Sequence, residues 1–140
     1  MGRIVNPDSA GKERIRLTKG VVLAIRHLAT QTDTSQETHD LAAFIVLALE
    51  AIAATIDVSV AAWEKRDYWV KADKFRMEWA WAGQMSKRLK LAILSDNWGD
   101  VATTSALVAQ RLQKITVPSG HRLGRPWVGA WDELIKNNKK

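Results

Sequence analysis

The chain has 140 residues, 21 Lys or Arg against 15 Asp or Glu, a formal net charge of +6 and no Cys. The lack of Cys excludes disulfides, thiol nucleophiles and thiolate metal sites, and the length suits a single domain spanning 1–140. The first residues, MGRIVNPDSAGKER, contain no apolar run, so we expect no signal peptide and a cytoplasmic location.

The charge is unevenly distributed along the chain. Residues 1–30 hold six Lys or Arg and two Asp or Glu, a net charge of +4. Residues 31–110 hold eight and eleven, a net charge of −3, and residues 111–140 hold seven and two, a net charge of +5. The basic ends indicate either a surface for nucleic acid or another polyanion, or ends that pack against the acidic middle.

The first predicted helix covers about residues 10–30, where apolar residues recur at the three- and four-residue spacing of one helical face. The turn before it, residues 6–9, supplies the N-cap candidates. Gly inside a helix costs about 1 kcal/mol relative to Ala, so we expect close packing against Gly20. Thr34 and Glu37 form a predicted capping box that starts the next helix.

The second predicted helix, which runs to about residue 65, contains the most informative stretch of the chain. Residues 41–63 are nearly all apolar and carry only two charges, Glu50 and Asp57. A helix that is apolar almost all the way round has to be enclosed. A bilayer span would bury both acids at a cost of several kcal/mol, so we predict the central helix of a soluble bundle and no membrane partner.

Glu50, Asp57 and Glu64 follow one another at seven-residue intervals and therefore share one line of this helix. Neighbouring acids lie about 10 Å apart along the axis, too far for a shared-proton pair. We expect either a solvated seam or a ladder of ion pairs with the first helix, in which Arg16 would lie near Glu50 and Lys12 near Asp57. The alternative is that this line of acids binds a partner.

The polar cluster at 66–69 predicts a turn, with one continuous helix to residue 94 as the alternative. We place a third helix at about residues 71–94. A fourth helix follows at about residues 101–115, with Asp100 as its N-cap.

Residues 69–81 alternate cations with aromatic side chains, a pattern found in proteins that stack single-stranded nucleic acid. Phe75 and Trp79, however, share a face with Leu89 and Ile93, which favours a core helix.

The loop at 117–125 is basic and leads into Pro126, which suits the first position of a short fifth helix. Arg122 and Arg125 precede that helix N-terminus, and the combination predicts an anion site. The alternative is a loop that clamps the last helix to the bundle.

The motifs that carry enzymatic chemistry are missing from the sequence. The three His residues form no His-Glu-x-x-His pair, and no Glu has a His three residues further on. Residues 37–40 hold three potential ligands, but ligands two apart on a helix do not face each other. Phosphate-binding glycine loops and the Gly-x-Ser-x-Gly elbow are absent as well. We therefore predict no catalytic residue, no metal and no cofactor.

The sequence predicts an all-α, four-helix up-down bundle with one long central helix and a short C-terminal fifth helix. The leading functional hypothesis is a non-enzymatic interaction or assembly protein that contacts nucleic acid or another polyanion. Its candidate contacts are Arg14, Arg16, Lys19, Arg122 and Arg125. The alternative is a purely protein-binding or self-associating, oligomeric module, since Trp is enriched at interface hot spots. Its candidate interface residues are Trp69, Trp98, Trp127 and Trp131.

Overall fold

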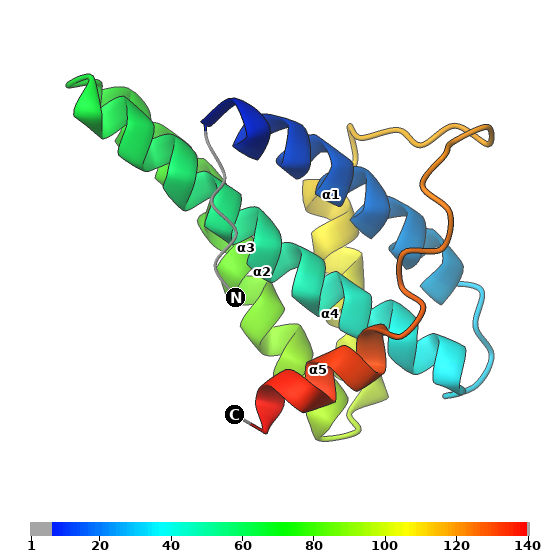
Figure 1. The fold of residues 1–140 in the computed structure, drawn as a ribbon. Coiled ribbons are helices and arrows are strands. Elements are labelled where there is room, and N and C mark those ends of the chain that lie inside the picture. The colour runs from blue at the N-terminus through cyan, green and yellow to red at the C-terminus, as the bar shows by residue number, and fades with distance from the viewer. Residues whose placement is uncertain (1–6, 140) are drawn as a thin grey trace.

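The computed structural model describes residues 7–139, with the side chains described from residue 9 onward. Five helices account for most of these residues, and the described part of the chain contains no strand. The predicted all-α bundle is therefore confirmed. The helices are α1 (Pro7–Leu28), α2 (Gln36–Lys65), α3 (Trp69–Leu94), α4 (Trp98–Arg111) and α5 (Ala130–Asn138) (Figure 1).

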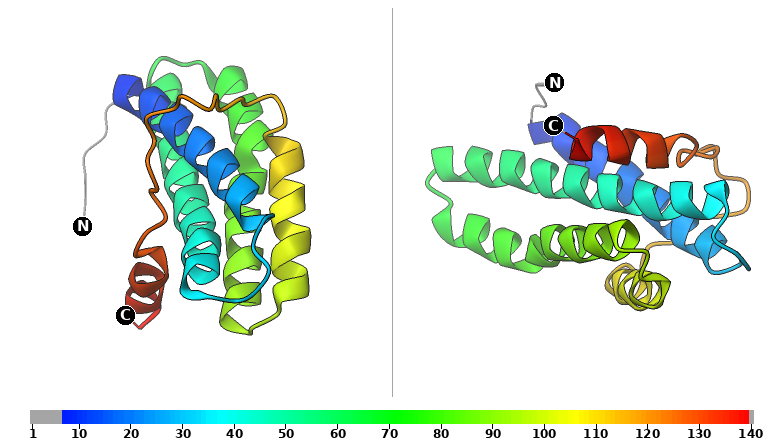
Figure 2. Two further views of the ribbon diagram at one scale, coloured as in Figure 1. Left: turned by 90° about the vertical axis from the view of Figure 1, so that its right-hand side faces the viewer. Right: turned by 90° about the horizontal axis from the view of Figure 1, so that it is seen from below.

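Helix α2 is the centre of the arrangement, packing against α1, α3 and α5. Helix α4 packs against α3 and touches α1, so α1 and α4 lie on the α2–α3 pair as a second layer. Helix α1 crosses α2 obliquely, and α5 follows a long loop back to the start of α2 (Figure 2). Helix α4 has 14 residues whereas α3 has 26, so the helices do not form a bundle of equal lengths. The regular four-helix up-down order stays a prediction.

The core explains why α2 is so apolar. Residues of α2 such as Leu41, Ile45, Leu49 and Ile52 are fully buried against the neighbouring helices. By length and composition alone α2 is apolar enough to cross a membrane, with a mean hydropathy of 2.2 in its most apolar window. Of that window, 56% is buried inside the protein, as expected for a core helix.

The predicted break between the second and third helices is confirmed. Helix α2 ends at Lys65, and Asp67 takes a left-handed conformation with φ of 62°. Asp is among the few non-Gly residues that accept this conformation, which lets the chain reverse without Gly or Pro.

Four predicted helix starts are wrong, those of α1, α2, α4 and α5, and α5 begins at Ala130 instead of Pro126. Ser35, not Thr34, caps α2 and accepts a hydrogen bond from the Thr38 N–H at 3.4 Å. Asn97, not Asp100, caps α4, and its side chain accepts the Asp100 N–H at 3.1 Å. At the N-terminus α1 already begins at Pro7, inside the predicted turn.

Candidate polyanion-binding surface

One face of α1 presents a row of cations to solvent. Lys12, Arg16 and Lys19 are exposed, and their spacing places them within about 60° of one another around the helix. Arg26 continues the row, and its guanidinium donates to the Val117 carbonyl at 3.2 Å. That hydrogen bond ties the loop after α4 to the end of α1, so two basic segments distant in sequence come together.

The loop brings Arg122 to the same place. Arg16 and Arg122 both line a pocket of about 150 Å³ between α1, α2 and the loop. Leu17, Gly20 and Phe44 are among its other lining residues, so the pocket combines apolar atoms with two guanidinium groups. The expected close packing at Gly20 is confirmed, because a Cβ there would lie 3.1 Å from Phe44 Cζ.

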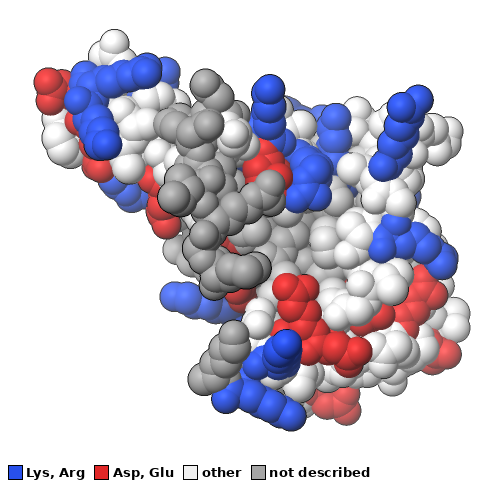
Figure 3. Space-filling view, viewed as in Figure 1, with Lys and Arg blue, Asp and Glu red and all other residues white. Residues whose placement is uncertain are grey.

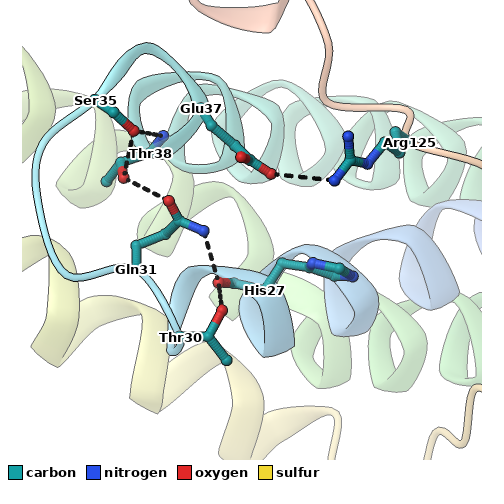
Figure 4. A network of polar contacts seen from close by, with 7 residues as sticks. All are labelled: His27, Thr30, Gln31, Ser35, Glu37, Thr38 and Arg125. Carbon is teal, nitrogen blue, oxygen red and sulfur yellow. Dashed lines mark hydrogen bonds and ion pairs between the residues drawn. The ribbon is translucent and has the colours of Figure 1, made fainter.

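Two acids form ion pairs with cations of this face and offset part of its positive charge. Glu13 forms an ion pair with Arg16 one turn away, and its hydrogen bond raises the pKa of the Arg16 guanidinium. Arg125 reaches Glu37 at 3.6 Å, and Figure 4 shows its side chain extending from the loop toward the start of α2. A network at the α1–α2 connector fixes that start, since the Thr38 hydroxyl donates to Gln31 at 3.1 Å.

We call the resulting patch the basic surface. It carries six cations, the two acids just named and Glu133, which lines a neighbouring pocket together with Arg16, a net charge of +3. In Figure 3 Lys and Arg side chains lie over α1 and the loop, further ones lie at the tip of the α2–α3 hairpin and beside α5, and Asp and Glu side chains gather toward α5 and the start of α2. The basic surface consists of Lys12, Arg16, Lys19, Arg26, Arg122 and Arg125.

Arg14 does not belong to this surface, contrary to the sequence-based prediction. Its guanidinium points toward α2, donating to the Thr55 hydroxyl at 3.2 Å, the Thr55 carbonyl at 3.1 Å and the Ser59 hydroxyl at 2.8 Å. It also lies 4.8 Å from the centre of the Phe75 ring. Partial burial lowers the pKa of Arg14, and the side chain braces three helices.

The predicted anion site at the N-terminus of the last helix is filled by the protein itself. Helix α5 begins at Ala130, after a turn at Pro126, so Arg122 and Arg125 do not directly precede it. The buried carboxylate of Asp40 accepts the Gly129 N–H at 3.3 Å and the Trp131 N–H at 3.0 Å. A carboxylate at this position satisfies both the free N–H groups and the helix dipole.

The predicted interface tryptophans occupy different environments. Trp127 is only 1% exposed and belongs to the core, so it cannot be an interface contact in the folded chain. Trp98 and Trp131 are half-buried on either side of His39, with ring centres 4.9 and 4.8 Å from the imidazole. Trp69 alone of the four is well exposed, at 55%.

Glu50 and Asp57 are exposed, which agrees with the solvated seam, whereas the alternative ladder of ion pairs with α1 is not formed within the described residues. Arg16 pairs with Glu13 instead of Glu50, and Lys12 has no ion pair with Asp57 within the described residues. Glu64 is bridged by Arg76 of α3 at 2.9 Å.

Sequence reasoning missed two members of the basic surface, Lys12 and Arg26. Both lie seven residues from Lys19, so the signal was present as a row at two-turn spacing. Within residues 9–139, no three His, Asp or Glu side chains are grouped so as to hold a metal ion.

Comparisons with protein-family models, with curated proteins and with solved structures find no match in any of the three. The function is therefore argued from the site alone.

Proposed function

We propose that this chain is a non-enzymatic interaction protein that binds nucleic acid through the basic surface. The observation that carries the proposal is the meeting of Arg16 and Arg122 at one pocket, although 106 positions separate them in the chain. Lys12 and Lys19 flank that pocket on α1. Guanidinium and ammonium groups on one face suit the repeated phosphates of a nucleic acid backbone.

The contacts that the basic surface offers are to phosphates, and this sets the expected selectivity. Such contacts fix position and supply affinity without reading sequence. We therefore expect mixed-sequence DNA and RNA to bind with similar affinity and strong salt dependence.

Fluorescence anisotropy of a short labelled duplex, titrated at several salt concentrations, tests the proposal. Removing one cation that neutralises a phosphate reduces the slope of log K against log salt by about 0.9 for B-DNA. The variant K12Q/K19Q removes two exposed cations and should reduce that slope by about 1.8 while weakening binding. The matched control K87Q/K136Q removes two exposed cations from α3 and α5 and should change neither quantity.

Two results would refute the proposal. One is undetectable binding of DNA and RNA at low salt. The other is a control variant that lowers the salt slope as much as K12Q/K19Q does, because general charge would then explain the affinity.

A further inference from the structure

The far end of the α2–α3 pair extends past the rest of the molecule. Figure 2 shows both helices running beyond the ends of α1 and α4. Helix α3 is 12 residues longer than α4, about 18 Å at 1.5 Å per residue. Along this length α4 is missing from the second layer, and the hairpin carries only a small core of its own, centred on Ile56, Val60 and Ala72.

This end bears a groove of about 1000 Å³ with aromatic walls, which we call the hairpin groove. Trp63, Tyr68, Trp69 and Phe75 are among the residues that line it. The guanidinium of Arg14, from α1, also lies over the Phe75 ring. The groove therefore opens on the face of the hairpin that α1 covers nearer the centre of the molecule. The groove thus continues a face that is buried elsewhere in the protein.

Large apolar side chains stand exposed beside the groove. Trp69 is 55% exposed, Val70 is 70% exposed and Met77 is 78% exposed. A cluster of exposed apolar groups of this kind marks an interaction site more often than a solvated surface. The hairpin therefore carries exposed apolar side chains next to the hairpin groove.

The charges of the hairpin groove balance. Asp67 and Glu78 line it together with Lys71 and Lys74, two charges of each sign. A polyanion or an anionic lipid surface would meet as many acids as cations here. Two-fold symmetry presents the same patch on both sides of an interface, so a patch with equal numbers of both charges can pair with a second copy of itself without net repulsion.

We propose that the hairpin groove is the interface of a two-fold symmetric dimer, in which the hairpin of a second copy completes the second layer. Lys74 and Glu78 are four residues apart on α3 and lie on the same side of it. When two α3 helices meet antiparallel about an axis near residue 76, Lys74 of each copy faces Glu78 of the other. Met77 then lies level with the axis on the flank of this contact, beside Val70, and is partly covered on association.

Sedimentation equilibrium over a series of protein concentrations tests the dimer. The mass should rise from 15.7 kDa toward twice that value as concentration increases. The variant W69A/M77S should weaken association about 10-fold or more, the effect of removing an interface hot spot. Leu91→Ser is the control, since Leu91 is 70% exposed on the same helix but lies 14 residues beyond Met77, about 21 Å further from the hairpin groove.

Charge exchange tests the symmetry directly. K74E alone and E78K alone each place like charges across the axis, so each should associate more weakly than the parent chain. An equimolar mixture places opposite charges across the axis and should restore a dimer. Native mass spectrometry with one variant ¹⁵N-labelled would identify that dimer as mixed.

Three outcomes would overturn the dimer. They are a parent chain that stays monomeric at every concentration, a control variant as damaging as W69A/M77S, and a mixture of K74E and E78K that fails to associate. Binding of a monomer to phosphatidylserine vesicles that depends on Trp69 would also overturn it, by assigning the patch to a lipid surface. None of these measurements involves the basic surface, so this inference and the proposed function fail separately.

Discussion

Replacing Arg14 with Met should destabilise the protein without affecting nucleic acid binding, whereas replacing Arg16 with Met should do the reverse. The Arg14 guanidinium makes three hydrogen bonds to Thr55 and Ser59 and a cation–π contact to Phe75. A hydrogen bond contributes about 1 kcal/mol net and a partly buried cation–π contact about 1 kcal/mol, so the three bonds and the ring contact sum to about 4 kcal/mol. Part of this sum is offset because Met removes the cost of partly burying the charge.

The net loss for Arg14→Met is about 2 kcal/mol, which with an unfolding entropy of about 2.1 cal/mol/K per residue lowers the Tm by about 7 °C. Among the described residues the ion pair of Arg16 is with Glu13, at the surface, so Arg16→Met should cost less than about 0.5 kcal/mol. Thermal unfolding followed by circular dichroism measures both. An Arg14→Met Tm within about 1 °C of the parent would refute the assignment of Arg14 as a brace.

Three further perturbations follow from the remaining contacts. Asp40→Ala removes the acceptor for two N–H groups at the start of α5, so we expect a loss of about 1–2 kcal/mol and faster hydrogen exchange throughout α5. The Arg88 guanidinium holds the pKa of the Asp100 carboxyl below its ordinary value of 3.8. The stabilisation from this pair is therefore complete above pH 3.8 and is lost as pH falls through the lower folded pKa, and urea midpoints should show that Arg88→Gln loses less stability than the parent on acidification. Gly20→Ala should change the free energy of unfolding by less than about 1 kcal/mol, because improved helix propensity offsets the displacement of Phe44, whereas Gly20→Leu should cost about 2 kcal/mol or more.

Apolar periodicity was sufficient to predict the helices and the buried position of α2, because burial of α2 dominates the packing of this chain. Helix ends were predicted less well. Ser35 and Thr34 are both accepted N-cap residues, with Ser slightly preferred, and which of them takes the position depends also on how the connector packs. The start of α5 depends on Asp40, 89 residues before Gly129, and no local pattern records such a contact.

The difference between Arg14 and Arg16 shows the same limit at the candidate site. Both are basic residues in one basic segment, and composition treats them alike. Two positions apart on a helix are about 200° apart around it, so one side chain turns toward α2 while the other faces solvent. Arg14 and Arg16 can be told apart only when it is known which face of α1 is covered by α2. That requires the tertiary structure.

The two proposed surfaces have a joint consequence that neither has alone. A dimer formed through the hairpin groove carries two copies of the basic surface, so a long nucleic acid can engage both, whereas a short duplex engages one. Linked binding of this kind raises affinity by about 10²-fold or more without any new contact, provided that the nucleic acid spans both surfaces.

W69A/M77S should therefore weaken binding to a long duplex and leave binding to a short one unchanged, whereas K12Q/K19Q should weaken both. Anisotropy titrations with duplexes of increasing length measure the difference. Equal losses for W69A/M77S at every length would show that Trp69 or Met77 contacts nucleic acid directly, and affinity that is independent of length in the parent chain would show that the two basic surfaces of a dimer do not act together.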